Sequence, residues 1–168
     1  MKAIFARTSI RAYQERPVEE EKLRKLMEAA MAAPSAGNQQ PWEFYIVTDK
    51  EKLAALSEAS PYAGCAKDAP VAIVVCSRKD GLRFPDYAHI DCSIASEHIW
   101  LEATELGLGC VWLGIAPMPE RMEIVRQVLG LPPTLDAFAL MPVGYPLKEQ
   151  EQQDRFDASR IHKIEGAR

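Results

Sequence analysis

The first residues with clear chemical potential lie near the N-terminus, in the segment Arg7-Thr8-Ser9-Ile10-Arg11. Two guanidiniums and two hydroxyls fall within these five residues. In an extended backbone alternate side chains point to the same side, so Arg7, Ser9 and Arg11 would share one face. That face offers several donors to one anion, and the forked guanidinium suits a phosphate. The spacing predicts an anion site; the alternative is a charged pair exposed to solvent.

A second polar segment reads PSAGNQQPW and covers Pro34 to Trp42. Its composition is typical of a loop, and two prolines restrict its ends. The side chains that could donate or accept hydrogen bonds are Ser35, Asn38, Gln39 and Gln40. Amides and a hydroxyl in one loop suit a planar heterocycle or the hydroxyls of a sugar. The alternative is an ordinary turn between a helix and a strand.

The glycine-rich segment GLGCVWLG, from Gly107 to Gly114, superficially resembles a dinucleotide-binding fingerprint. These glycines, however, follow an expected helix and lead into an expected strand, which is the reverse of the Rossmann order. We therefore reject that interpretation. Gly114, at the end of the strand, would allow a ligand to approach the backbone closely. The alternative is close packing against another element of the fold.

The C-terminal segment Asp154-Arg155-Phe156-Asp157, followed by Ser159-Arg160-Ile161-His162, supplies two more guanidiniums. Arg155 and Arg160 could add positive charge to an anion site. The alternative is a solvated tail.

The elements that must position these segments follow from hydrophobic periodicity and from turn residues. Helices are expected over residues 19–33, 50–59 (with Asp49 as the N-cap), 86–106 (ending at Gly107) and 120–129 (ending at Gly130). Strands are expected over residues 42–48, 71–76, 110–115 and 138–145. Apolar residues occur nearly all round the helix 86–106, which indicates burial in a large core or at a subunit interface. Pro142 places the last strand near an edge of the sheet.

Strands and helices are mixed without strict alternation, which favours an α+β three-layer sandwich over a doubly wound sheet. We found no internal repeat or linker, and we expect one domain over residues 1–168. The formal net charge of −4 argues against a nucleic-acid partner held by bulk charge. The four cysteines are widely spaced and the three histidines scattered, so no metal site is expected. We expect neither a signal peptide nor a membrane helix, and hence a cytoplasmic protein.

Taken together and in this order, four segments resemble the nitroreductase family of FMN-dependent flavoproteins. They are RTSIRAY, PSAGNQQPW, GLGCVWLG and the RFDxSRIH tail, and they span nearly the whole chain. The resemblance implies a three-layer α-β-α sandwich with a mostly antiparallel mixed sheet, in an obligate homodimer with FMN at the subunit interface. It also implies that the helix 86–106 forms the core of the dimer.

The resemblance further implies a role for each matching residue. Arg7 and Ser9 would hold the FMN phosphate with Thr8 alongside, and Arg11 would lie near the pyrimidine edge of the flavin. From the partner subunit would come Pro34, Ser35 and Asn38, with Gln40 as a further candidate. Gly114 would direct its backbone N–H toward flavin N5, and Trp112 and Leu113 would line that side. Arg155 would return to the phosphate, and Arg160 is a further candidate for the same role.

The implied activity is ping-pong hydride transfer from NADH or NADPH, through flavin N5, to a small acceptor such as a nitroaromatic or a quinone. No protein nucleophile or metal is required, because the flavin carries the chemistry. One alternative is a specialised relative, such as an enoate- or thiazoline-type dehydrogenase or a dehalogenase. Another is a flavin-binding redox sensor without enzymatic activity. The lysines near the flavin in larger members have no clear counterpart around Tyr62–Lys67.

Overall fold

A five-stranded sheet forms the middle of the molecule. The computed structural model describes residues 2–148, 150–152, 154–164 and 166. The sheet contains β1 (Trp42–Val47), β2 (Val71–Arg78), β3 (Gly109–Cys110), β4 (Leu113–Gly114) and β5 (Leu135–Gly144). The strand order is β1-β2-β5-β3, and β4 also pairs with β5. All these named pairings are antiparallel, and a parallel bridge joins Ser9 to Cys110, so the sheet is mixed but mostly antiparallel, as expected.

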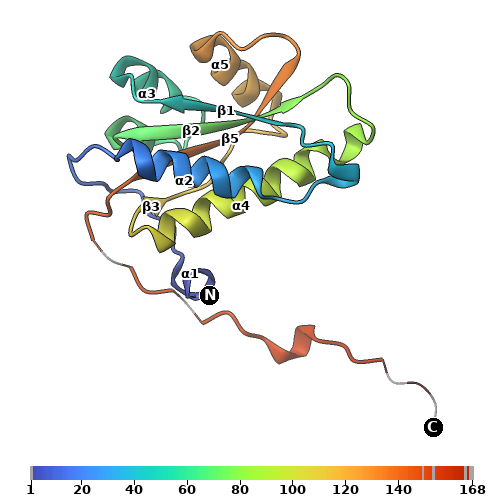
Figure 1. Ribbon diagram of the computed structural model, residues 1–168. Helices are drawn as coiled ribbons and strands as arrows, with labels where there is room; N and C mark the ends of the chain where they lie inside the picture. The colour runs from blue at the N-terminus through green and yellow to red at the C-terminus, as the bar shows by residue number, and fades with distance from the viewer. Residues whose placement is uncertain (1, 149, 153, 165, 167–168) are drawn as a thin grey trace.

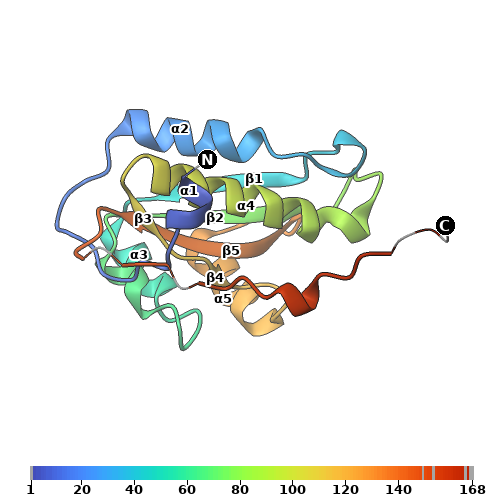
Figure 2. The same cartoon turned by 90° about the horizontal axis from the view of Figure 1, so that it is seen from below.

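Helices cover both faces of this sheet and make three layers, as Figure 2 shows most clearly. On one face lie α2 (Glu20–Met31) and α4 (Ala88–Glu105), and on the other lie α3 (Lys50–Leu56) and α5 (Pro119–Leu129) (Figure 1). The short α1 (Ala3–Ala6) contacts α4. The three-layer α+β sandwich predicted from the order of elements is therefore confirmed.

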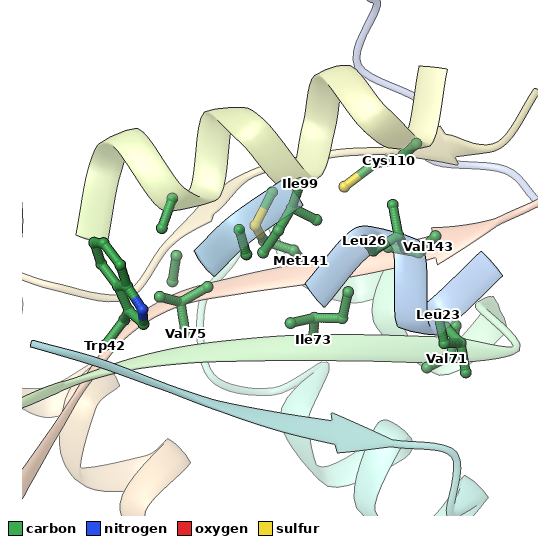
Figure 3. Close-up of a cluster of buried hydrophobic side chains, with 14 of the residues drawn as sticks. Leu23, Leu26, Trp42, Val71, Ile73, Val75, Ile99, Cys110, Met141 and Val143 are labelled. Carbon is green, nitrogen blue, oxygen red and sulfur yellow. The ribbon is translucent and has the colours of Figure 1, made fainter. Parts of the chain in front are cut away.

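The central strand β2 explains how one apolar run supports two cores. Its residues alternate between the faces of the sheet, as the two-residue period of a strand requires. Val71, Ile73 and Val75 belong to the core under α2 and α4, together with Leu26 and Ile99 (Figure 3). The intervening residues 72, 74 and 76 belong to the core under α3 and α5. The prediction that 71–76 is covered on both faces is confirmed.

Local signals placed several helix ends correctly. The carboxylate of Asp49 accepts a hydrogen bond from the Lys52 amide at 2.9 Å and caps α3, which begins at Lys50. Helix α5 ends at Gly130 in the left-handed region, with φ of 64°. After α4, Gly107 has φ of 71° and the Leu108 amide bonds back to the Ala103 carbonyl, as in a Schellman end.

Two strand predictions were wrong. The segment expected as one strand, 110–115, forms β3 and β4 with a break at residues 111–112. The last strand, expected near an edge because of Pro142, is β5 in the interior of the sheet. The two errors have one cause. Residues Met141 and Pro142 have no partner in the registers of β3 and β4, so the missing N–H of Pro142 coincides with a gap in the ladder.

One face of α4 remains open within a single chain. Cys92, Ala95 and Ile99 are buried against the sheet, whereas Ile90 is 54% exposed. The segment after β5 extends away from the layered body and carries exposed Phe156 and Ile161 (Figures 1 and 2). Across the described parts of the chain, every helix is too short or too polar to cross a bilayer.

Candidate functional site

The N-terminal segment runs beside β3, and of the three residues expected on one face only Arg11 is in the described lining of the pocket below, whereas Arg7 contacts Trp100. Ser9 bridges to Cys110, and the Ile10 amide donates to the Cys110 carbonyl at 3.0 Å. Ile10 is buried against Gly109, where an added Cβ would come within 2.5 Å of the Ile10 side chain. Gly109 therefore serves the close approach of the two backbones. Thr8 and Ile10 line one pocket, whereas Arg11 lines another, so Thr8 does not share the face of Arg11.

The guanidinium of Arg7 packs against α4, but one of its nitrogens has no hydrogen-bond partner there. Its guanidinium stacks on the ring of Trp100, with its carbon 4.1 Å from the ring centroid. The indole N–H of Trp100 in turn donates to the Thr8 carbonyl at 3.2 Å. Nη1 of Arg7 is buried without a hydrogen-bond partner, and within the described residues it is the one such side-chain atom. Because an unpaired buried donor is costly, this atom indicates a missing acceptor.

A pocket of about 430 Å³ brings together residues from two of the predicted segments, 7–11 and 107–114. Arg11, Trp112, Leu113 and Gly114 line it, and all four were expected to meet a ligand. An added Cβ on Gly114 would meet nothing within 4 Å, so close packing does not explain this glycine within one chain. The backbone of Gly114 is exposed to the pocket instead, which favours the interpretation that a ligand approaches it.

The same pocket contains three residues that the sequence analysis missed: Ser60, Tyr62 and Arg121. Arg121 is the most informative because its Nη1 donates to the Gly114 carbonyl at 3.0 Å. It lies in the first turn of α5, where an acidic residue is normally favoured by the helix dipole. A basic residue at that position was the available signal in the sequence.

The polar loop 34–41 adopts a strained backbone at two of the predicted binding residues. Asn38 has φ of 55° and Gln40 has φ of 47°, both in the left-handed region that few residues other than glycine adopt. Such conformations cost on the order of 1–3 kcal/mol each and persist where the surroundings hold them. Gly37 is also left-handed, and an added Cβ there would come within 2.6 Å of the Phe84 ring.

The restraint on this loop comes mainly from Asp91 of α4, which is 2% exposed. Its carboxylate accepts from the Ala36 amide at 2.9 Å and from the side-chain amide of Gln39 at 2.7 Å. Gln39 also exchanges two hydrogen bonds with the backbone of Phe84. Arg78 donates to the carbonyl of Gln39 at 3.0 Å. Asp91 and Gln39 therefore position the loop, a role that the sequence analysis did not assign to either residue.

Replacing Asp91 with Ala should lower the free energy of unfolding by about 1–3 kcal/mol, because two part-buried donors would lose their acceptor. Urea denaturation measures this change. Asp86→Ala is a matched control, since Asp86 precedes the same helix but is exposed. Equal stabilities of the two variants would show that the carboxylate of Asp91 does not hold the loop.

Some predicted site residues do not meet in one chain. Pro34, Ser35, Asn38 and Gln40 are absent from the described lining of the pocket that holds Arg11. The hydroxyl of Ser35 accepts from the Gln40 amide at 3.0 Å, within the loop itself.

The tail arginines also stand apart from this pocket. Arg160 pairs with Asp157 at 3.0 Å, three residues earlier in the chain. Arg155 is exposed and makes no hydrogen bond or ion pair to another described residue.

The cysteines are free, and three of them are buried. Burial raises the pKa of the Cys76 and Cys92 thiols to about 12, so they stay protonated at neutral pH. Within the described residues no cluster of three His, Cys, Asp or Glu side chains could hold a metal ion. The donor set of the pocket, with two guanidiniums and backbone groups, suits an organic anion better than a metal.

Comparison with known proteins agrees with this arrangement. The model of the nitroreductase family matches residues 4–61 and 61–145. A protein of Archaeoglobus fulgidus named "Putative NADH dehydrogenase/NAD(P)H nitroreductase" is 44% identical over 167 residues, which cover 97% of this chain and 96% of that protein.

Solved structures agree as well. An FMN-dependent nitroreductase from Clostridium difficile superposes with a TM-score of 0.91 at 32% identity, covering 98% of this chain and 99% of that one. A "putative nitroreductase in complex with fmn" from Desulfovibrio desulfuricans superposes with a TM-score of 0.85 at 27% identity, covering 99% and 96%. By its sequence and by its fold, this chain belongs to the nitroreductase family.

Proposed function

We propose that this protein is an FMN-dependent oxidoreductase that passes hydride from NADH or NADPH to a small acceptor such as a nitroaromatic or a quinone. The observation that carries the proposal is the pocket in which Arg11, Trp112 and Leu113 surround the exposed backbone of Gly114. The buried, unpaired Nη1 of Arg7 adds a donor that suits a phosphate oxygen. Relatives named for NAD(P)H and FMN chemistry support the same assignment.

Different residues of this chain would bind different parts of the cofactor. Arg7 and Ser9 would hold the phosphate, with Thr8 adjacent in the sequence but facing another pocket. Arg11 would lie at the pyrimidine edge of the ring. Trp112 and Leu113 would form an apolar wall, which excludes water from the face where hydride is transferred.

Bound FMN would accept and release hydride at N5, and the protein would supply binding, orientation and electrostatics. The N–H of Gly114 would fix the ring by a directional hydrogen bond. The guanidinium of Arg11 would favour negative charge on the ring, because a nearby cation stabilises an anion in a site of low dielectric constant. No side chain of the pocket needs to act as a nucleophile.

The loop 34–41 would reach this site from a second copy of the chain. Within one chain its residues Pro34, Ser35, Asn38 and Gln40 do not line the pocket of Arg11, so a homodimer would complete the site. The open face of α4, with Ile90 exposed, would form the interface. Arg155 would approach the phosphate from the extended tail.

The experiment that tests the proposal is an absorbance spectrum of the purified protein, followed by anaerobic titration with NADH and with NADPH. We expect bound flavin, bleaching by a nicotinamide and reoxidation by a small acceptor. Bound flavin that neither nicotinamide reduces and that passes electrons to no acceptor would instead indicate a redox sensor. Failure to bind added FMN would contradict the proposal altogether.

A methyl group at position 114 should interfere with FMN and leave folding intact. Gly114→Ala is expected to weaken FMN binding by about 1–3 kcal/mol, the usual cost of adding a methyl group at a close contact. Thermal unfolding without FMN should not change, because an added Cβ there meets nothing within 4 Å. Gly64→Ala is the matched control, since its Cβ also meets nothing. Equal FMN affinities of the two variants would contradict the assigned role of Gly114.

A further inference from the structure

Two guanidiniums face one pocket, and neither has a carboxylate partner in the part of the chain that the structure describes. Among the described ion pairs none includes Arg11 or Arg121. Arg121 is held by the Gly114 carbonyl at 3.0 Å, and Nη1 of Arg11 lies 3.5 Å from the Ser9 carbonyl. No acidic side chain occurs among the described residues that line the pocket. Two like charges in one pocket repel each other, so its electrostatics favour an anionic occupant.

Arg121 lies where local electrostatics disfavour a cation. It is the third residue of α5, an eleven-residue helix whose N-terminus carries a partial positive charge. A basic residue in this turn breaks a local rule of helix construction, and such violations are expected at functional sites. No carboxylate pairs with it in the described chain, and its guanidinium carbon lies over the Tyr62 ring at 6.0 Å from the centroid, at the outer limit of a cation–π contact.

The hydrogen bond to Gly114 fixes Arg121 beside the backbone expected to meet the flavin ring. A guanidinium carries five N–H donors, and this bond uses one of them. The others remain for an occupant of the pocket. Arg121 is only partly exposed, which strengthens its field relative to a fully solvated charge.

We propose that Arg121 is a second cationic residue of the flavin site and that it stabilises the negative charge gained when bound FMN is reduced. This inference rests on the proposed function. A hydride carries two electrons and one proton, so its transfer breaks the C4–H bond of the nicotinamide, forms an N–H bond at N5 and releases NAD(P)⁺. The negative charge that remains on the ring would be shared by the fields of Arg11 and Arg121. Arg121 thereby raises the reduction potential of bound FMN.

Arg121→Gln tests the charge, because glutamine can still donate to the Gly114 carbonyl. We expect the reduced cofactor to bind about tenfold less tightly relative to the oxidised one, which lowers the midpoint potential by about 30 mV for a two-electron couple. Arg121→Lys keeps the charge and should retain most of the wild-type potential. Potentials are measured by anaerobic titration against a reference dye in each variant.

Arg126→Gln is the matched control, since Arg126 lies on the same helix but is paired with Glu123 and lies outside the described lining of the pocket. Its potential should equal that of the wild type. If Arg121→Gln and Arg121→Lys both weaken FMN binding without changing the potential, Arg121 only supports the Gly114 backbone and the proposal is wrong. If the wild type binds no FMN, the proposed function itself fails, which is a distinguishable result.

Discussion

Arg7→Ala is expected to weaken FMN binding by about 1.5–3 kcal/mol, or about 10- to 150-fold in Kd. The loss follows from removing a charge-assisted hydrogen bond to the phosphate. The structure strengthens this expectation because Nη1 of Arg7 is buried and unpaired, while the guanidinium is held in place on the Trp100 ring. A donor fixed before the ligand arrives loses little conformational entropy on binding.

Fluorescence titration of the flavin-free protein measures this affinity, and thermal unfolding reports separately on the lost Trp100 contact. Arg24→Ala is the control, because Arg24 is exposed and paired with Glu28 on the outer surface of α2. Arg7→Lys should recover only part of the affinity, since an ammonium lacks the forked geometry. An unchanged Kd in Arg7→Ala would remove Arg7 from the phosphate site.

Ile90→Asp should convert the proposed dimer to a monomer and release the flavin in the same step. The loss of flavin should be nearly complete, because a monomer would lack the loop 34–41 of its partner. The monomer itself should stay folded, since Ile90 is 54% exposed and contributes little to the core. Ile94 is a poorer choice because it packs against the buried cluster under α4. At an apolar interface, an unpaired carboxylate loses its hydration without compensation.

Sedimentation velocity, with absorbance read at the flavin wavelength, measures both effects in one experiment. Ile124→Asp is the matched control, because Ile124 is also exposed but lies on α5, in the opposite layer. A variant that stays dimeric would exclude Ile90 from the interface. A monomer that keeps its flavin would contradict a site shared between two chains.

Local chemistry explains why most elements were predictable. Asp49 begins α3 and Gly130 ends α5 through hydrogen bonds and backbone angles that involve only nearby residues. The apolar run of β2 indicated a strand with both faces covered because its composition leaves no polar side. The gap between β3 and β4 was not predictable in this way, since it depends on the register against β5.

The candidate site likewise contains residues that the sequence indicated and residues that only the fold reveals. Arg11, Trp112 and Gly114 could be chosen from the sequence because their types and order match a family motif. Arg121 lies outside the matching segments; its basic type in the first turn of α5 was a signal, but its contact with Gly114 exists only in the folded chain. Asp91 likewise acts on a loop more than fifty residues away, and nothing in its own segment indicates that role.

The sequence by itself therefore determined the helices α2 to α5, the central strand, the three-layer class and the positive residues of a prospective anion site, but not the short α1. These properties depend on side-chain type and on contacts within a few residues. The tertiary structure alone decided the interior position of β5 and the left-handed loop held by Asp91. It also decided that Arg11 and Arg121 line the same pocket. Each of these depends on which distant segments come into contact. Those contacts are set by packing helices onto both faces of the sheet, which buries the apolar side chains of both faces at once.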